Sequence, residues 1–483
     1  MPVRTDTLVI GAGSAGLFCA LRWAERGSVT LIEAGPDAGD PPPRWALYDY
    51  TLPAECYYRY TDADTGQPIP QGRGLGGGST VNSAAALRGQ PWDYDGWQVP
   101  GWSWAECLAG FRAIEADQQY AAADFHGADG LIPVTRLEPG PLDLAVFEWC
   151  RRAGHPRADD HNAPGALGYG VWTTNRRDGG RWGTWVGVVP AARRAGVAIR
   201  PGTAAARLVF DGTRCTGAEV TGPDGSELIT AGRVVVCAGA YGSPALLMRS
   251  GIGPEAVLAA LGAEPVSVLP GVGANLMDHP WCLLDVDVTD PALIEARPVS
   301  GALLRYELPA ERGEHIEAEI FPWQTRPYDL TSPPTRVSFT AALMAPRSRG
   351  RFELGPAGPE LHVGHLAEDA DAADMAEIVA VTAELIESLA KDGVVTIPED
   401  AWWRRDDLAA ASRAAVSSYH HHSGTCRMGD PGAAGTVVGP DLAVLGVSGL
   451  AVADSSVMPV IPRANTNLAA MMIGYRSADV MAS

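Results

Sequence analysis

The sequence predicts an α/β fold in which a dinucleotide-binding unit is interleaved with a second region that is rich in strands. One observation is a glycine run at residues 11–16. It follows a short apolar segment, and an acidic residue comes about twenty positions after it. Another is a series of β-type segments over 204–240, and a third is an alternation of strands over 280–365. Because these regions alternate along the chain, we do not expect each domain to be one continuous segment.

The N-terminal unit has the order strand, glycine turn, helix, strand, acidic residue. Residues 7–10 are apolar and β-type, as expected for a buried parallel strand. Residues 17–26 are predicted to be a helix, and Gly27 suits its C-terminus. Residues 29–32 form a second apolar run that ends at Glu33. A carboxylate at the end of this second strand can accept hydrogen bonds from a ribose diol.

The glycine spacing explains how such a unit would hold a pyrophosphate. Gly11 permits a tight turn, Gly13 lets the pyrophosphate approach the backbone, and Gly16 lets the helix pack close to the strand. The helix N-terminus offers N–H groups and the positive end of a dipole to phosphate. A lone glycine pattern is also consistent with a simple turn, but the complete unit favours a dinucleotide site.

Composition and charge exclude several classes of protein. The chain has 483 residues, 46% of them hydrophobic, so it can bury a large core, and its net charge of −20 argues against nucleic-acid and anionic-lipid partners. We expect no transmembrane segment and no signal peptide. The eight cysteines are scattered, which favours reduced thiols in the cytoplasm. Lys391 is the only lysine, so kinase-like and pyridoxal-type chemistry is not expected.

Further elements follow from local patterns. Strands are predicted at 207–210, 217–220, 233–239 and 282–288, the third of them buried and ending in glycine. Residues 371–391 are predicted to be an amphipathic helix with one apolar side, made of Ile378, Leu385, Ile386 and Leu389.

Several separate blocks carry a resemblance that runs through most of the chain. After the N-terminal unit they occur in order at 72–97, 239–253, 269–279, 421–429, 452–459 and 465–467. With these blocks the sequence resembles the glucose–methanol–choline (GMC) family of flavin oxidoreductases. The resemblance implies an FAD-binding Rossmann-like domain and a substrate domain built on an antiparallel sheet.

The resemblance also implies a division of the chain. We expect residues 1–150, 195–280 and 415–483 to form the FAD-binding domain, and residues 151–194 and 281–414 to form the substrate domain. The substrate pocket is expected to come from residues around 280–410, including loops near residue 300.

The implied cofactor is FAD. By family position, Asn82 and Ser83 would bind the flavin or pyrophosphate, the backbone near Ala205 would meet the adenine, and Asp454 would support the ribityl–phosphate region. Some members tether FAD through a histidine at the position of Val81, so we expect non-covalent FAD here. The full expected set is Gly11, Gly13, Ser14, Ala15, Gly16, Glu33, Ala34, Arg73, Gly76, Gly77, Asn82, Ser83, Ala85, Ala205, Asp454, Thr466 and Asn467.

Alcohol oxidation requires a base that is neutral near pH 7, which suits histidine, while a flavin accepts the hydride. Three histidines lie together at 420–422. A polar loop or a metal site are the alternatives, and without a matching carboxylate or cysteine set we expect no metal. Family spacing to Gly424 selects His421 as the catalytic histidine, with His420 as its main rival.

The family's partner position is a second histidine or an asparagine. Counting fourteen residues back from Asp479 gives Asn465, whose amide could orient the substrate oxygen. The alternative is a loop asparagine that caps the last helix. The pair resembles choline-oxidising members more than sugar oxidases with two histidines. Several tryptophans, including Trp172, Trp182 and Trp185, either line a pocket or pack in the core.

The resemblance therefore predicts an FAD-dependent oxidoreductase that oxidises a small-molecule primary or secondary alcohol, with oxygen or a quinone-type electron acceptor. One alternative is non-redox or light-driven chemistry on the same fold, as in a cyanohydrin lyase or a decarboxylase. Another is an electron-transfer flavoprotein that re-oxidises a redox cofactor such as mycofactocin. The chain is shorter than many relatives, and a trimmed substrate domain would expose the flavin to a bulky donor.

Overall fold

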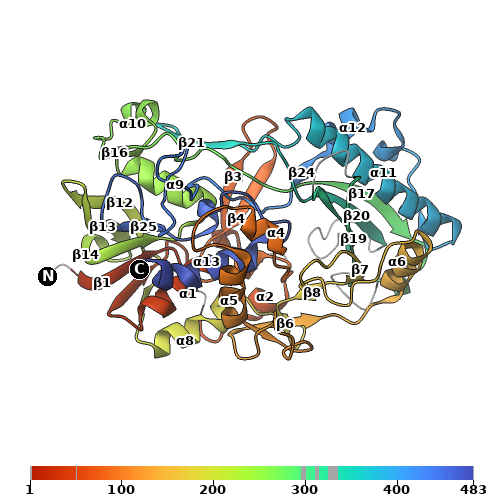
Figure 1. Ribbon diagram of the computed structural model, residues 1–483, viewed down its shortest axis with the longest axis horizontal. Helices are drawn as coiled ribbons and strands as arrows, with labels where there is room; N and C mark the ends of the chain where they lie inside the picture. Colours follow the sequence, from red (N-terminus) through yellow and green to blue (C-terminus); the bar gives the residue numbers. More distant parts are fainter. Residues whose placement is uncertain are drawn as a thin grey trace.

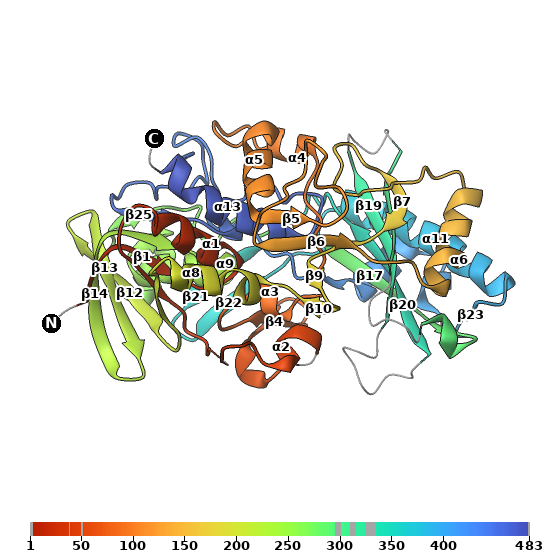
Figure 2. The same ribbon diagram turned by 90° about the horizontal axis from the view of Figure 1, so that it is seen from below.

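Two large sheets occupy opposite ends of the molecule, with helices and loops between them (Figures 1 and 2). The computed structural model describes residues 3–37, 39–49, 52–294, 301–309, 315–324 and 335–481. The expected mixed α/β fold with an antiparallel second sheet is confirmed. Parts of the region expected to form the substrate pocket, at 295–300, 310–314 and 325–334, lie outside the described residues.

The first sheet combines a parallel centre with an antiparallel extension. Four strands run parallel in the order β11, β2, β1, β14, and β25 pairs parallel with the C-terminal end of β14. The N-terminal part of β14 instead pairs antiparallel with β13, which pairs antiparallel with β12. The strands are β11 (Ala198–Arg200), β2 (Val29–Ile32), β1 (Val3–Ile10), β14 (Gly225–Val236), β13 (Arg214–Gly222), β12 (Ala204–Asp211) and β25 (Leu450–Val452).

Helix packing brings the two ends of the chain together beside this sheet. Helix α1 (Ser14–Trp23) packs against α13 (Thr466–Val480), which also packs against α5 (Trp104–Ile114). The contact is close, because a Cβ on Gly474 of α13 would lie 2.1 Å from the carbonyl oxygen of Ala15. The start of α13 therefore lies next to the N-terminal glycine turn.

The second sheet is antiparallel throughout. Helix α11 (Asp369–Lys391) covers one face, and its four predicted apolar residues are all buried there. The opposite face of the sheet carries the aromatic residues Trp281, Phe321 and Trp323. The strands are β23 (Val395–Thr396), β17 (Pro280–Val288), β20 (Arg336–Leu343), β19 (Glu317–Gln324), β18 (Ala302–Glu307), β7 (Gly168–Val171) and β24 (Ser417–Ser418).

One helix crosses the expected domain division. Helix α6 (Pro141–Arg152) lies mostly within 1–150, yet it packs against α11 and β18. Its buried residues Leu142, Val146 and Trp149 join the hydrophobic core of the second sheet. Around residue 141 the chain therefore passes from one core to the other.

The other elements connect the two sheets or lie at their edges. The helices are α2 (Arg44–Tyr48), α3 (Gly78–Val81), α4 (Pro91–Asp95), α7 (Thr184–Gly187), α8 (Val189–Arg194), α9 (Gly239–Arg249), α10 (Glu255–Leu261) and α12 (Leu408–Ala415). The strands are β3 (Tyr57–Thr61), β4 (Pro68–Gly72), β5 (Glu115–Asp117), β6 (Ile132–Arg136), β8 (Thr173–Thr174), β9 (Arg176–Arg177), β10 (Gly180–Arg181), β15 (Ile252–Gly253), β16 (Ser267–Val268), β21 (Arg351–Gly355) and β22 (Gly358–His362).

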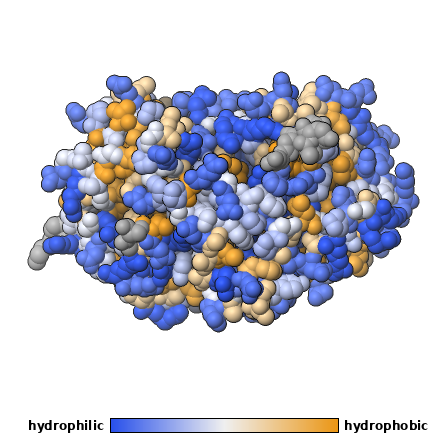
Figure 3. Space-filling model, viewed as in Figure 1, coloured by the Kyte–Doolittle hydropathy of each residue, from blue (hydrophilic) through white to orange (hydrophobic). Residues whose placement is uncertain are grey.

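The surface is mainly polar. Figure 3 shows hydrophobic residues as separate patches on a mostly hydrophilic face. Among the helices described, none is long and apolar enough to cross a bilayer.

Candidate active site

The N-terminal glycine turn has the geometry that a phosphate cradle needs. Gly11 has φ +103°, and a Cβ on it would lie 2.4 Å from the carbonyl oxygen of Cys237. A Cβ on Gly16 would lie 1.8 Å from the carbonyl oxygen of Gly11, so the helix packs closely on the turn. By contrast, the nearest atom to a Cβ on Gly13 is the Cα of Gly77, 3.9 Å away. The backbone at Gly13 is therefore open to a ligand.

A second glycine loop closes over the first. The Gly76 N–H donates to the carbonyl oxygen of Ala12 at 2.8 Å, and a Cβ on Gly77 would lie 2.9 Å from the Cα of Gly13. Ser14, Ala15 and Gly16 form the first turn of α1, whose N-cap has no side-chain hydrogen bond. The first-turn N–H groups therefore lack a side-chain cap, and the positive dipole end faces this cradle.

Glu33 holds three backbone segments together. Its Oε2 accepts from the Ala12 N–H at 2.9 Å, and its Oε1 accepts from the N–H groups of Gly35 at 2.8 Å and Gly74 at 3.1 Å. The expected role was binding a ribose diol, and Oε2 keeps one lone pair for such a ligand. The carboxylate therefore also orders the loops that surround the expected nucleotide.

Other expected cofactor residues lie beside this cradle. Arg73 donates from Nη2 to the carbonyl oxygen of Ala34 at 2.9 Å. The Thr203 N–H donates to the carbonyl oxygen of Glu33 at 2.8 Å, which places Ala205, two residues further along the chain, near the same end. The second glycine loop and the start of β12 thus flank Glu33.

The C-terminal segments complete the cradle. Asn467, in the first turn of α13 after Thr466, accepts from the Ser14 hydroxyl at 2.7 Å through its Oδ1. Its Nδ2 is buried and has no partner within the described part of the chain. Asp454 accepts from the Gly239 N–H at 2.8 Å. The open backbone, the uncapped helix start and the orphaned amide together fit the pyrophosphate region of FAD.

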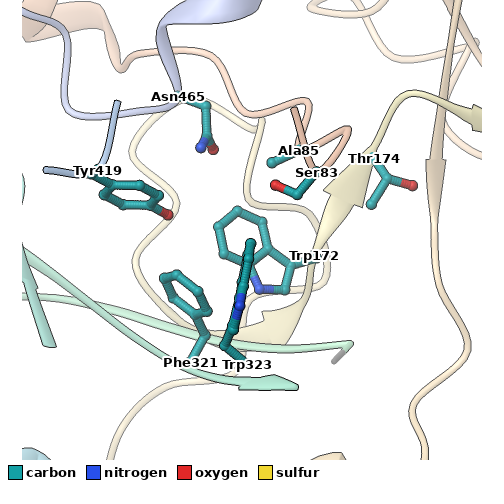
Figure 4. Close-up of a pocket in the computed structure, with 8 residues that line it drawn as sticks. All are labelled: Ser83, Ala85, Trp172, Thr174, Phe321, Trp323, Tyr419 and Asn465. Carbon is teal, nitrogen blue, oxygen red and sulfur yellow. The ribbon is translucent and has the colours of Figure 1, made fainter. Parts of the chain in front are cut away.

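The loop after α3 leads from the cradle to a pocket. Its backbone is held by two arginines, because the carbonyl oxygen of Asn82 accepts from Arg181 Nε at 2.6 Å and that of Ser83 accepts from Arg176 Nη2 at 3.1 Å. Ser83 and Ala85 line the pocket directly. Figure 4 shows a polar side facing an aromatic side. The lining residues are Ser83, Ala85, Trp172, Thr174, Phe321, Trp323, Tyr419 and Asn465.

His421 lies in a hydrogen-bonded chain next to this pocket. Its Nε2 is 3.1 Å from Asn465 Nδ2, and its Nδ1 is 2.8 Å from His279 Nδ1. The ring also packs against Tyr419, with ring centroids 4.2 Å apart. Asn465 is the N-cap residue of α13, but its side chain makes no capping hydrogen bond. The Asn465 amide therefore contacts His421 instead of the helix backbone.

The tautomer of the imidazole follows from the orientation of the Asn465 amide. With the Asn465 amide placed as it is, Nδ2 donates to Nε2 of His421, so Nε2 carries a lone pair. The proton then sits on Nδ1 and is donated to His279. Burial, together with the neighbouring His279 ring, holds the pKa of His421 well below the usual histidine value. Burial also lowers the pKa of His279 to about 4. The Nε2 lone pair of this neutral His421 accepts from Asn465, so it can take a proton only from a group that displaces that hydrogen bond.

The neighbouring histidines have different surroundings. His420 is exposed, with φ +64°, and its N–H donates to the Ser418 hydroxyl at 2.9 Å. His422 is buried, with Nε2 3.4 Å from the carboxylate of Asp278. That carboxylate also accepts from the His421 N–H at 2.7 Å and thereby fixes the backbone of the loop that carries the three histidines. Within the described residues, no group of three or more His, Cys, Asp or Glu side chains is arranged so that it could hold a metal ion.

Sequence reasoning missed part of the site. Of the three tryptophans considered, Trp172 lines the pocket, whereas Trp185 packs in the core near Gly76 and Trp182 lies under Arg177. The sequence pattern alone did not reveal the histidine that contacts His421 or the pocket residues of the second sheet. The family block that ends in Asp-His was the available signal for His279, and the aromatic residues of 319–323 were the signal for the pocket wall. The missed residues are His279, Thr174, Phe321, Trp323 and Tyr419.

Comparisons with known proteins agree with this geometry. Two family models, both described as GMC oxidoreductase, match residues 5–281 and 346–474. The chain belongs to the GMC oxidoreductase family, a class of flavin-dependent oxidoreductases, as its sequence blocks predicted.

Individual relatives match along nearly their whole length. An uncharacterised GMC-type oxidoreductase of Rhodococcus erythropolis is 32% identical over 99% of this chain and 98% of its own. The oxygen-dependent choline dehydrogenase of Pseudomonas aeruginosa is 31% identical over 99% and 95%. Among solved structures, pyridoxine 4-oxidase from Mesorbium loti has a TM-score of 0.84 at 26% identity and covers 98% of both chains.

Proposed function

We propose that this protein is an FAD-dependent oxidoreductase that oxidises a primary or secondary alcohol, with FAD held non-covalently and His421 as the base. The observation that carries this proposal is the chain of contacts from His279 through His421 to Asn465 at the edge of the pocket. It presents a neutral imidazole nitrogen and an amide side by side. Relatives named for the oxidation of choline and pyridoxine support an alcohol as the substrate.

The side chains divide the work as follows. When bound, FAD supplies the hydride acceptor. A substrate hydroxyl that enters between Asn465 and His421 can replace their direct hydrogen bond, accept from the amide Nδ2 and donate its proton to Nε2 of His421. The Nδ1–H of His421 stays directed at His279, so the ring cannot turn its protonated nitrogen toward the substrate. General-base catalysis of this kind contributes about 10²- to 10⁴-fold to the rate.

The test is an anaerobic panel of alcohols followed by flavin absorbance in the dark. We expect at least one primary or secondary alcohol to bleach the yellow enzyme and to yield one equivalent of aldehyde or ketone. Air or a quinone analogue is then added to the reduced enzyme, to test whether oxygen or a quinone is the electron acceptor. Bleaching that requires light, or a colour that survives every alcohol, would contradict alcohol oxidation and favour the non-redox or light-driven alternatives.

A further inference from the structure

We propose that the pocket selects alcohols with a flat, uncharged, aromatic body and discriminates against alcohols that carry a quaternary ammonium group. This inference names the substrate class and rests on the proposed function. It depends on three features of the pocket: its wall of aromatic rings, the separation of its polar and apolar sides, and the lack of an acidic side chain among its described lining residues.

The apolar side is a continuous wall of rings. Trp172 meets Phe321 edge to face, with centroids 5.0 Å apart and planes at 86°. Trp323 packs beside Phe321 at 6.3 Å, and Trp281 packs edge to face on Trp323 at 5.9 Å. Trp281 in turn stacks on Tyr419 at 4.6 Å. Each ring is held by its neighbours, so the wall presents fixed surfaces.

The described lining leaves little free space. The cavity holds about 10 Å³, about the room that one water molecule needs, so a substrate has to displace side chains of the lining. A planar ring that does so gains stacking contacts with the aromatic wall. A trimethylammonium group has no flat face for such stacking. The ring contacts therefore favour flat substrates.

The polar groups lie on one side. In Figure 4 the Asn465 amide and the Tyr419 hydroxyl point into the pocket across from Trp172 and Trp323. His421 lies directly behind Asn465 and Tyr419. A hydroxyl placed on this side puts the rest of the substrate among the rings. The pocket thus orients a molecule that has one polar end and one apolar end.

The described lining of the pocket offers no counter-charge for a cation. None of its described lining residues is Asp, Glu, Lys or Arg. The nearest carboxyl is that of Glu319, which accepts from the Tyr419 hydroxyl at 3.4 Å, and its other oxygen is 3.7 Å from the Arg305 guanidinium. Burial raises the pKa of Glu319 to about 8 even with Arg305 beside it. At pH 7 the carboxyl is mostly protonated, whereas the arginine keeps its positive charge.

Aromatic cages elsewhere do bind quaternary ammonium groups through ring faces. Here no charged side chain stands among the described lining residues, and the Arg305 guanidinium next to Glu319 is paired with Glu317 at 2.6 Å. The cost of removing the cation from water would then be met by the rings alone. An uncharged aromatic group gains the same apolar contacts without that cost.

The experiment measures binding to the holoenzyme after its flavin has been fully reduced without oxygen, so that no turnover occurs. Isothermal titration calorimetry at pH 7 compares benzyl alcohol, choline and 3,3-dimethylbutan-1-ol, the uncharged isostere of choline. We expect benzyl alcohol to bind at least tenfold more tightly than choline, with the isostere between them. Choline binding as tightly as its isostere, or more tightly than benzyl alcohol, would overturn the inference.

Two variants and a control locate the preference. Phe321→Leu should reduce benzyl alcohol affinity about tenfold or more, whereas Trp104→Leu on α5, away from the pocket, should leave it unchanged.

Glu319→Gln should change choline affinity less than twofold at pH 7, because the carboxyl is already neutral. A tenfold loss of choline binding in that variant would reveal an anionic cation site and contradict the inference. The calorimetric measurement of binding involves no turnover. If no alcohol bleaches the flavin in the dark, the proposed function is refuted, but the measured binding preference stands.

Discussion

At the scale of single residues, the site depends on how the neighbours of His421 fix its hydrogens. Asn465 contacts Nε2 and His279 contacts Nδ1, so each ring nitrogen has one role. Motif spacing could predict His421 and Asn465, because both stand at fixed distances from recognisable neighbours. The contact with His279 could not be predicted in the same way, since it joins residues 142 positions apart through the start of β17. Only the folded arrangement of the sheet and the catalytic loop creates it.

Val81 is the residue behind the proposal that FAD is held non-covalently. A valine offers no nucleophilic atom for a bond to the flavin, and it lies at the end of α3, next to Asn82. We therefore expect acid precipitation of the yellow holoenzyme to leave all flavin in the supernatant, as measured by its absorbance. A pellet that stays yellow after washing would show a covalent link from another residue.

At the scale of elements, local pattern predicted strands well and helix ends less well. The strand at 29–32 and the long amphipathic helix correspond closely to β2 and α11. Helix α1 instead begins at Ser14, because Gly13 takes the N-cap position and the turn itself starts the helix. The expected helix over 17–26 therefore began three residues late and also ended three residues late.

The aromatic face of β19 escaped prediction for a physical reason. Its first six residues are all buried, so polar and apolar positions do not alternate as they do on a half-exposed strand. One face packs into the core under α11, and the other carries Phe321 and Trp323 of the pocket wall as well as the buried Glu317 and Glu319. Burial on both faces removes the periodic signal that reveals which side chains face a ligand.

At the scale of the whole molecule, a buried charge cluster links the cofactor loops to the second sheet. His126 lies between Glu115, 2.8 Å from Nδ1, and Asp160, 2.7 Å from Nε2. Arg136 pairs with Asp160 and with Asp117. Arg88 pairs with Glu115 at 3.3 Å, so three carboxylates face two guanidinium groups, and the charges balance only when His126 is protonated.

The segment that carries Asp160 reaches both regions. The Asn162 side chain accepts from the Arg88 N–H at 3.0 Å, next to the second glycine block. The carbonyl oxygen of His161 accepts from Arg305 Nη1 at 3.0 Å, on β18 of the second sheet. Loss of the cluster should therefore weaken the packing between the two sheet regions as well as the structure of the local loop.

This cluster predicts a pH dependence of stability. Burial opposes the charge on His126, but hydrogen bonds to Asp160 and Glu115 outweigh it and raise the pKa of His126. Its contribution is fully present below the unfolded value of about 6.5 and is lost as pH rises through the folded pKa. The urea midpoint of the holoenzyme should therefore fall as the pH is raised from about 6 to about 9.

A His126→Gln variant should lose that slope and about 3–5 kcal/mol of unfolding free energy near pH 6, because buried carboxylates lose their partner. The matched control is His362→Gln on β22, whose partner Asp64 is at the surface and whose ion pair should matter little. Equal slopes in the His126 variant and the wild type would assign the pH dependence to other groups.

The central claim is that a neutral His421 takes the proton from an alcohol as the flavin is reduced. Stopped-flow reduction without oxygen, with any alcohol that bleaches the wild type, compares His421→Ala with His420→Ala. Both variants should remain yellow, and His421→Ala should reduce its flavin about 10²- to 10⁴-fold more slowly, while His420→Ala stays within a few-fold of the wild type. Unchanged reduction in His421→Ala, or a large loss in His420→Ala alone, would contradict the account.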